Sequence, residues 1–334
     1  MKTVKVKHVG FWSGVSYDKE LISRSLKGHY NIEESDEPEF VICSIFGKPF
    51  EYCDHPQVRI MYAGENFIPD FNLVDYAVGV YPLSFGDRYC YLPGCIDGNN
   101  HCAELQHKSR EYPDSVLEQK PYFANFIASH DSENNIRGDF FKKLSEYKRV
   151  ESPGSFLNNM SDGMTVSLDE GKTEFQQKCK FTLCFESTNH YGFITEKITD
   201  AFYADTIPVY FGSSSVSTIF NPKAFINCSD YDSFDEVIKR IIELDQDDEA
   251  YMEMLRQPVF IEPDYVDRKM QELDSFLQSI IEQGAEKAYR RSKVYAAYEY
   301  EKYIKDHRET IADIPSSTLL KTVYNRVRHR ISKH

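Results

Sequence analysis

The sequence predicts an α/β protein with two Rossmann-like domains, each built on a parallel sheet. Short apolar runs, typical of strands that are covered on both faces, alternate with segments of helical periodicity. Residues 181–212 combine an apolar run, a polar loop, a helix and a second apolar run, which is the order of a βαβ unit. The chain has 334 residues, more than one hydrophobic core usually holds, so two domains are expected.

The first domain is predicted to span residues 1–118. A helix is expected at 18–27, and apolar runs predict strands at 4–9, 40–46, 58–62 and 75–80. Residues 84–118 have weak periodicity and several glycines and prolines, so we expect long loops there. Strands that alternate with helices in this way favour a Rossmann-like sheet.

The second domain is predicted to span residues 119–285. It should open with a strand at 122–129 and a helix at 136–147. The βαβ unit at 181–212 follows, and a further helix is expected at 233–244. Both domains are therefore expected to contain a Rossmann-like parallel sheet.

The last part of the chain, residues 286–334, is predicted to form a helical crossover and a basic amphipathic tail. From residue 314 onward there is no acidic residue, and apolar side chains fall on one helical face with basic ones on the other. Such a helix would bind an anionic membrane surface through residues 315–334. The alternative is a basic, partly disordered tail.

The helix of the βαβ unit begins with charged residues that suit a sugar nucleotide. Thr195 is a predicted N-cap, and Glu196 and Lys197 occupy the first turn. Backbone amides and the positive end of the helix dipole favour an anion there, and Lys197 adds a full positive charge. Glu196 would repel a phosphate, but it can accept two hydrogen bonds from neighbouring sugar hydroxyls. The alternative is an ordinary capped surface helix.

Three further side chains stand in loops at predicted ends of strands or helices. Glu65 follows a predicted strand, where a carboxylate would face an interdomain cleft, unless it only anchors its loop. Arg137 begins a helix and can clamp a pyrophosphate; the alternative is a surface ion pair with Asp139 or Glu133. Trp12 offers an aromatic face to a sugar, or else packs within the protein.

Bulk composition excludes several classes of function. The net charge of −14 argues against a nucleic-acid partner. There is no apolar run of about 18 residues and no apolar signal-peptide core, so a cytoplasmic location is expected. If the tail binds a membrane, the contact is expected to be peripheral, on the inner face of the cell membrane. The eight cysteines contain no CxxC pair and are predicted to be reduced thiols. Neither a Gly-x-Gly fingerprint nor a P-loop occurs.

No cofactor and no metal site are predicted. The Cys/His group at 90–102 lacks the spacing of a common zinc finger. Asp230 and Asp232 form a DxD sequence, but Asp232 directly precedes a predicted helix and is expected to be its N-cap. Whether Mn²⁺ or Mg²⁺ stimulates the protein stays open.

One stretch resembles the signature of the α1,3/4-fucosyltransferases, glycosyltransferase family 10, with the bacterial branch most similar: it reads CFESTNHYGFITEKITDAF, followed by PVYFG. Similar blocks lie at 63–79, 123–137 and 220–226, so the resemblance covers roughly residues 4–260. It implies a GT-B fold, in which two Rossmann-like domains face each other across a cleft. It also implies inverting transfer of L-fucose from GDP-β-L-fucose, a substrate, to a GlcNAc hydroxyl of an N-acetyllactosamine-type glycan, with α1,3 linkage.

The resemblance adds to the roles inferred from the residues themselves. Glu65 matches the family's proposed general base, and Arg137 matches its Ile-Arg segment. Trp12 is the predicted acceptor contact because of its aromatic face. Two cations would hold the diphosphate, and a carboxylate would bind the ribose. The predicted donor-binding residues are Arg137, Glu186, Ser187, Asn189, Tyr191, Glu196 and Lys197.

Two positions depart from the family's pattern. Ser187 stands where the family has Asn, and Phe193 stands where it has Tyr, so both have less polar reach toward the nucleotide. Asn189 and Tyr191 are the candidates to compensate. These departures leave two alternatives open: a catalytically silent sugar-nucleotide or glycan-binding protein, or a GT-B transferase that uses another nucleotide sugar. The oligomeric state is left open.

Overall fold

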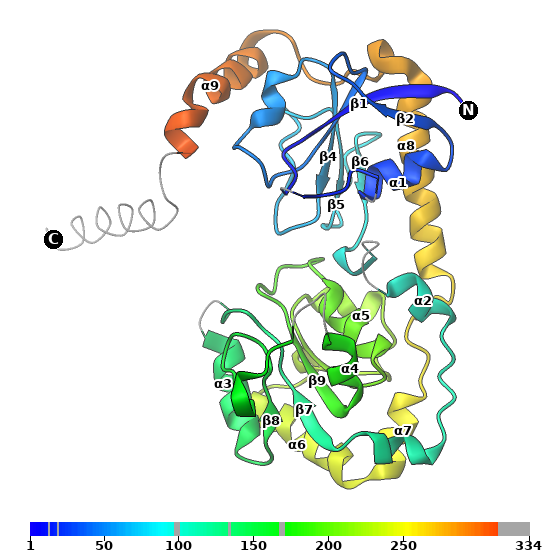
Figure 1. Ribbon diagram of the computed structural model, residues 1–334, viewed down its shortest axis with the longest axis vertical. Coiled ribbons are helices and arrows are strands. Elements are labelled where there is room, and N and C mark those ends of the chain that lie inside the picture. Colours follow the sequence, from blue (N-terminus) through cyan, green and yellow to red (C-terminus); the bar gives the residue numbers. More distant parts are fainter. Residues whose placement is uncertain (13, 19, 97–100, 133–134, 167–170, 313–334) are drawn as a thin grey trace, which may run out of the picture.

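The computed structural model describes residues 1–12, 14–18, 20–96, 101–132, 135–166 and 171–312, and these form two separate parallel sheets. Figure 1 shows the two sheets in two bodies, one above the other, with the long helix α8 (Tyr265–Ala288) running beside the upper body and reaching down to α2 at the top of the lower one. The prediction of a two-domain α/β fold is therefore confirmed.

The first sheet has six strands in the order β2-β1-β3-β4-β5-β6, and every pairing is parallel. Its strands are β1 (Thr3–Val9), β2 (Asn31–Glu34), β3 (Phe40–Cys43), β4 (Val58–Ala63), β5 (Tyr76–Gly79) and β6 (Tyr89–Tyr91). Every residue of β3 and β5 is buried, which is why these strands were visible as apolar runs. Helix α1 (Leu21–Lys27) begins after Glu20, whose carboxylate accepts hydrogen bonds from the amides of Ile22 and Ser23 at 3.0 and 2.8 Å.

The edges of this sheet differ from the prediction. Strand β2 is mostly exposed, and β6 has only three residues, so neither carries an apolar pattern that sequence periodicity can detect. The stretch predicted as long loops, 84–118, contains β6 together with short helices. These are η2 (Gly94–Ile96), α2 (Cys102–His107) and η3 (Asp114–Gln119).

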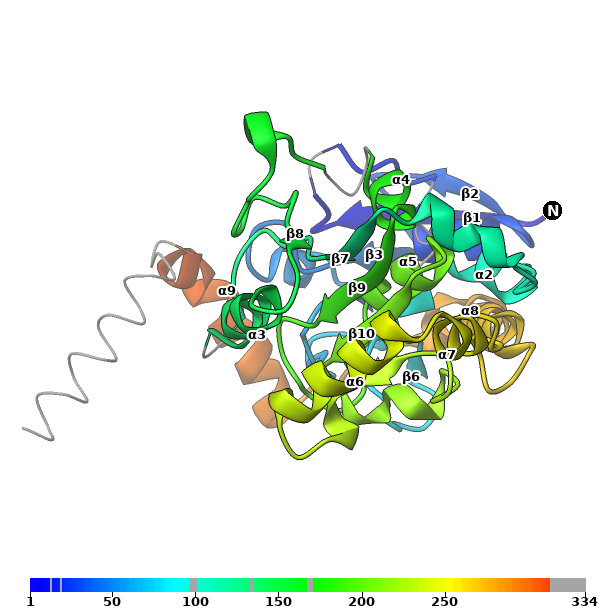
Figure 2. The ribbon, with the colours of Figure 1, turned by 90° about the horizontal axis from the view of Figure 1, so that it is seen from below.

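The second sheet has five parallel strands in the order β11-β10-β9-β7-β8. Its strands are β7 (Tyr122–Asn125), β8 (Val150–Glu151), β9 (Cys179–Phe185), β10 (Ile207–Phe211) and β11 (Ile226–Asn227). Its helices are α3 (Ile136–Ser145), α4 (Lys172–Gln177), α5 (Glu196–Tyr203), α6 (Phe234–Gln246) and α7 (Asp248–Leu255). Figures 1 and 2 both place β7 and β9 between α3 on one side and α5 on the other. The predicted βαβ unit is present as β9, α5 and β10.

One predicted helix cap is displaced by a single residue. The N-cap of α6 is Ser233, whose hydroxyl accepts a hydrogen bond from the amide of Glu236 at 3.4 Å. Asp232, which we predicted as the cap, instead donates its own amide to the Glu236 carboxylate at 3.1 Å. Ser233 and Glu236 thus pair across the first turn much as in a capping box, except that Glu236 accepts from the amide that precedes the N-cap residue.

Helix α8 carries the chain back from the second domain to the first. Leu277 and Ile281 share one hydrophobic cluster with Leu21 of α1, and the hydroxyl of Ser25 donates to Asp274. We predicted the crossover from residue 286 onward, whereas these contacts lie earlier, within α8 itself. The domain boundaries after residues 118 and 285 stay a prediction.

A buried ionic network attaches the segment after α8 to the first domain. Asp75 is 0% exposed and accepts hydrogen bonds from the amides of Arg290 and Arg291 at 2.8 and 2.9 Å. It also accepts from the side chain of Arg291 at 3.0 Å and from the amide of Arg59 at 2.8 Å. The guanidinium of Arg59 in turn binds Glu301 of α9 (Tyr295–Ala312) at 2.6 Å.

Replacing Asp75 with alanine is expected to lower the free energy of unfolding by about 3–5 kcal/mol, because the buried Arg291 loses its close ion pair at 3.0 Å and keeps only Glu301 at 3.7 Å. Denaturant unfolding of the full chain measures this loss. Asp87→Ala is the matched control: this aspartate, 62% exposed, pairs with Arg290, and its loss should cost less than about 1 kcal/mol. Equal losses in the two variants would contradict the role of the network.

The predicted membrane-binding tail, 315–334, lies outside the described residues. Among the helices that the structure does describe, none combines the length and apolar character that crossing a bilayer requires. The membrane surface as a partner and the cytoplasmic location therefore stay predictions.

Candidate functional site: a charged helix start facing an interdomain cleft

The loop between β9 and α5 is held against both domains. The amide of Gly192 donates to the hydroxyl of Ser213, just after β10, at 2.7 Å. Gly192 has a φ of +87°, and a Cβ built on it would lie 2.1 Å from Cδ of Pro82 in the first domain. Only glycine fits at this position, so the loop can approach the first domain closely.

Glu186 is the centre of a hydrogen-bonded cluster at the end of β9. It is 1% exposed, and its Oε1 accepts from the amide and hydroxyl of Thr195 at 2.7 and 3.0 Å. Its Oε2 accepts from the same hydroxyl at 2.8 Å and from Nζ of Lys197 at 3.1 Å. Thr195 occupies the N-cap position of α5, as predicted, but its side chain makes no capping hydrogen bond. The buried carboxylate recruits the Thr195 hydroxyl instead.

The charges at the start of α5 stabilise each other. Burial lowers the pKa of Lys197, but the carboxylates of Glu186 and Glu196 outweigh it and hold that pKa above its usual range. Burial raises the pKa of Glu196, but Lys197 and Lys172 outweigh it and hold that pKa below its usual range. Both side chains are therefore charged at neutral pH, and Lys197 is 29% exposed, so a ligand can reach it.

Arg137 lies in the first turn of α3 and is buried against the end of β9. Its Nε and Nη2 donate to the carbonyl oxygen of Phe185 at 3.1 and 2.7 Å, and its Nη1 donates to that of His130 at 3.0 Å. All three hydrogen bonds go to backbone carbonyl oxygens. The alternative prediction was a surface ion pair with Asp139 or Glu133, of which Glu133 lies outside the described residues. Arg137 thus holds the strand end beside Glu186.

Glu65 follows β4 and faces the charges of the second domain. Partial burial raises the pKa of Glu65, the negative charge of Glu196 raises it further, and Lys197 acts in the opposite direction. The side chain remains exposed to solvent. The charges at the start of α5 thus act on the Glu65 carboxyl group, although the two belong to different domains.

A pocket of about 680 Å³ lies between the domains, next to Glu65. The first domain contributes Asn66, Phe67, Ile68 and Tyr81 to it, and the second contributes His190 and Tyr191. Tyr191, one of the predicted donor-binding residues, is 62% exposed. Asn66, Tyr81 and His190 were missed by sequence reasoning, because nothing in their local pattern signals a contact made across two domains.

Three more residues of the loop between β9 and α5 differ in burial. Ser187 is half-buried and Asn189 is exposed, and both lie between Glu186 and α5. Phe193 is buried against Val80 and Tyr81 of the first domain. The residue that departs from the family's tyrosine thus makes an apolar contact between the domains.

Trp12 lies after β1 with one ring face covered and the side chain 61% exposed. It stacks on Phe46, which follows β3, with ring centroids 4.2 Å apart and planes at 24°. The two loops lie close together, since a Cβ on Gly47 would be 2.5 Å from Cα of Gly10. Because β1, β3 and β4 are parallel, their carboxyl ends place Trp12 and Glu65 on the same edge of the sheet.

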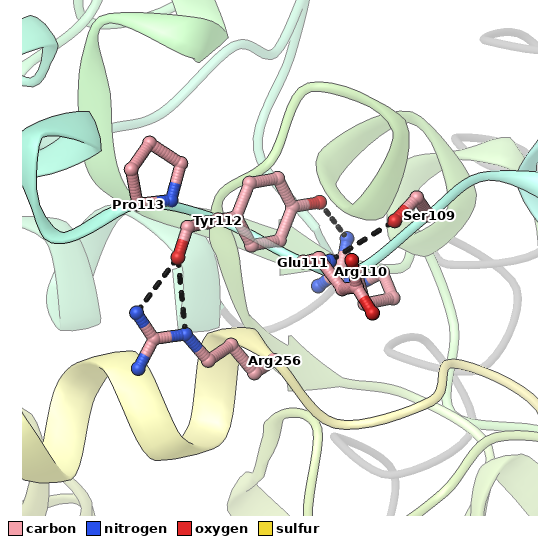
Figure 3. Close-up of a pocket in the computed structure, with 6 residues that line it drawn as sticks. All are labelled: Ser109, Arg110, Glu111, Tyr112, Pro113 and Arg256. Atoms are coloured by element: carbon pink, nitrogen blue, oxygen red, sulfur yellow. Dashed lines mark hydrogen bonds between the residues drawn. The ribbon is translucent and has the colours of Figure 1, made fainter.

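A second hollow, of about 640 Å³, is separate from this site. It lies between residues 109–113 and Arg256, whose Nη2 donates to the carbonyl oxygen of Tyr112 at 2.7 Å (Figure 3). None of the predicted site residues lines it. We therefore take the interdomain pocket, with its charged border, as the candidate site.

Two parallel α/β domains that face each other across a cleft, with a C-terminal helix crossing back to the first, define a GT-B glycosyltransferase fold. Two family models match the sequence: the glycosyltransferase family 10 (fucosyltransferase) C-terminal model over residues 117–281, and the α-(1,3)-fucosyltransferase FucT N-terminal domain over residues 6–96. The chain belongs to glycosyltransferase family 10, the fucosyltransferases.

A curated bacterial protein and a crystal structure are similar to this chain in sequence and in fold. The α-(1,3)-fucosyltransferase FucT of Helicobacter pylori is 37% identical over 226 residues, which are 59% of this chain and 46% of that protein. The chain thus matches about half the length of this relative. The crystal structure of an α1,3-fucosyltransferase with GDP-fucose has a TM-score of 0.67 at 29% identity, covering 83% of this chain and 91% of that one.

A more distant structure supports the fold alone. The DNA-modifying enzyme β-glucosyltransferase has a TM-score of 0.51 at 12% identity, covering 84% of this chain and 99% of that one. The GT-B architecture is therefore shared beyond the family.

Proposed function

We propose that this protein transfers L-fucose from GDP-β-L-fucose to a GlcNAc hydroxyl of an N-acetyllactosamine-type glycan, forming an α1,3 linkage with inversion at the anomeric carbon. Membership of the fucosyltransferase family supports the class of reaction. A relative of the same fold, 29% identical, has been crystallised with GDP-fucose, which supports the donor.

The observation that carries the proposal is that a carboxylate of one domain and a cation of the other lie at the same interdomain cleft. Glu65 of the first domain directly precedes Asn66, which lines the interdomain pocket. From the second domain the pocket is lined by His190 and Tyr191, in the loop that leads to Glu196 and Lys197 at the start of α5, and these two charges also affect the pKa of Glu65. A base on one side and a cation on the other are what the transfer of a sugar from a diphosphate to a hydroxyl requires.

On the donor side, Lys197 and Arg137 are proposed to bind the diphosphate. An ammonium has three N–H donors, and Lys197 uses two of them on Glu186 and Thr195, so one remains for a phosphate oxygen. A guanidinium has five, and Arg137 uses three on backbone carbonyls, so two remain. These cations would stabilise the negative charge that develops on the leaving GDP. The proposed step uses no metal ion.

The other proposed contacts to the donor come from residues at the start of α5 and in the loop that precedes it. Glu196 is 35% exposed and is proposed to accept hydrogen bonds from the ribose hydroxyls. Ser187, Asn189 and Tyr191, in the loop that precedes α5, are proposed to line the rest of the nucleotide. Glu186 is buried beneath them, so we propose that it supports the donor site through Lys197 and Thr195.

On the acceptor side, Glu65 is proposed to remove the proton from the attacking GlcNAc hydroxyl. Its raised pKa suits a general base, because a carboxylate that holds a proton more strongly accepts one more readily. Trp12, on the same edge of the sheet, is proposed to stack against the apolar face of an acceptor sugar.

Product analysis tests the function. The full chain is incubated with GDP-fucose and, separately, with each of the two N-acetyllactosamine isomers. We expect release of GDP and an α1,3-fucosylated product with the β1,4 isomer, identified by NMR linkage analysis. Binding of GDP-fucose without any product would instead indicate a silent binding protein, and transfer from GDP-mannose or a UDP-sugar alone would indicate another donor.

A further inference from the structure

Tyr81 joins the two domains at the border of the cleft. It follows β5 in the first domain and is 7% exposed. Its hydroxyl donates a hydrogen bond to Oδ1 of Asn66 and lies 3.4 Å from Nδ1 of His190 in the loop before α5. Its ring stacks on Phe193 of the same loop, with centroids 6.3 Å apart. One side chain therefore contacts both the loop that follows β4 and the loop that precedes α5.

Asn66 is the residue through which Tyr81 reaches Glu65. The amide of Phe67 donates to the carbonyl oxygen of Glu65 at 2.6 Å, so residues 65–67 form a three-residue turn with Asn66 at its centre. Asn66 itself is exposed, and the bond from Tyr81 restrains its side chain. A restrained central residue limits the directions in which the Glu65 carboxylate can point.

The contact with His190 requires a particular proton arrangement. The hydroxyl proton of Tyr81 lies on the bond to Asn66, so His190 must carry a proton on Nδ1 to donate to the Tyr81 oxygen. The distance of 3.4 Å is longer than an ideal hydrogen bond. Such bonds shorten when a ligand closes an active site, and His190 belongs to the loop that connects Glu186 to α5.

We propose that Tyr81 is a positioning residue, which aligns the Glu65 turn with the donor loop through Asn66 and His190. The inference rests on the proposed function, because it treats Glu65 as the general base. The hydroxyl of Tyr81 contacts Asn66 and His190, whereas Lys197 and Arg137, the cations proposed to bind the diphosphate, are held by Glu186, Thr195 and backbone carbonyls. Loss of the hydroxyl is therefore expected to affect the chemical step far more than the affinity for GDP.

Tyr81→Phe tests this inference, since it keeps the ring that stacks on Phe193 and removes only the hydroxyl. We expect kcat to fall about 5–10-fold, the value of one lost hydrogen bond, with unchanged affinity for GDP in calorimetry. Thermal stability should also be unchanged, because water can replace the hydroxyl at the exposed Asn66. Tyr251→Phe is the matched control: it removes a hydroxyl that donates to the carbonyl oxygen of Lys180 at 2.7 Å, away from the cleft, and should leave kcat unchanged.

A double-mutant cycle with Asn66→Ala identifies the route. If Tyr81 acts through Asn66, the double variant should lose no more kcat than the more impaired single variant. An unchanged kcat in Tyr81→Phe, additive losses in the cycle, or a loss confined to GDP affinity would each overturn the inference. Absence of product with the unmodified chain would instead overturn the proposed function, so the two failures are distinguishable.

Discussion

Replacing Glu65 with glutamine is expected to lower kcat by about 10²–10⁴-fold, the usual contribution of a general base. Glutamine keeps the size of the side chain and its ability to accept a hydrogen bond, but it cannot take the proton of the acceptor hydroxyl. GDP affinity should be unchanged, because the cations that are proposed to bind the diphosphate, Lys197 and Arg137, stand on the second domain. Initial rates with saturating donor and acceptor, together with GDP calorimetry, measure both quantities.

The pH dependence gives an independent test of the same role. A base acts when it is deprotonated, so activity should be lost as the pH falls through the raised pKa of Glu65. The negative charge of Glu196 contributes to that increase in pKa, so in Glu196→Gln the acidic limb of kcat should move to lower pH. Glu111→Gln, at an exposed position on the other pocket, should change neither kcat nor the limb. A Glu65→Gln protein with full transfer rate would remove Glu65 from the base role.

Replacing Lys197 with alanine is expected to weaken GDP binding by about 10–100-fold, because a charge-assisted hydrogen bond to phosphate is lost. The free energy of unfolding should also fall by about 2–3 kcal/mol, less than the loss for a fully buried pair, because Lys197 is 29% exposed. Glu186 then remains buried without its cation. Calorimetry with GDP and denaturant unfolding measure the two effects.

A second substitution separates the two effects of Lys197. Adding Glu186→Gln to Lys197→Ala removes the uncompensated buried charge, so stability should recover in part while GDP affinity stays low. Lys143→Ala, which breaks an exposed ion pair with Asp235 on the same domain, should change stability by less than about 1 kcal/mol and GDP affinity not at all. If the double variant regained GDP affinity, Lys197 would have only a structural role.

The fold was predictable wherever burial leaves a local pattern. Strands β3, β4, β5 and β9 are covered on both faces and therefore appear as apolar runs in the sequence. The edge strands β2, β6 and β8 were missed, because they are short or exposed and are stabilised by a single neighbouring strand.

The candidate site was predictable in composition but not in contacts. The amino end of α5, with its Glu and Lys, follows from capping and charge rules that act within one helical turn. The sequence did not indicate that Arg137 binds the carbonyl oxygen of Phe185, 48 residues away, or that the Thr195 hydroxyl serves Glu186 and does not cap the helix.

The sequence by itself therefore determined the class of fold, the family and the residue types at the proposed donor and acceptor sides. The tertiary structure alone decided which parts of the chain come together: Tyr81 contacts His190 across a separation of 109 residues, and the charges at the start of α5 act on Glu65 from the other domain. The physical reason is that periodicity, capping and helix dipoles act over a few residues, whereas ion pairing and loop contact depend on distances in space that are set by the packing of two domains.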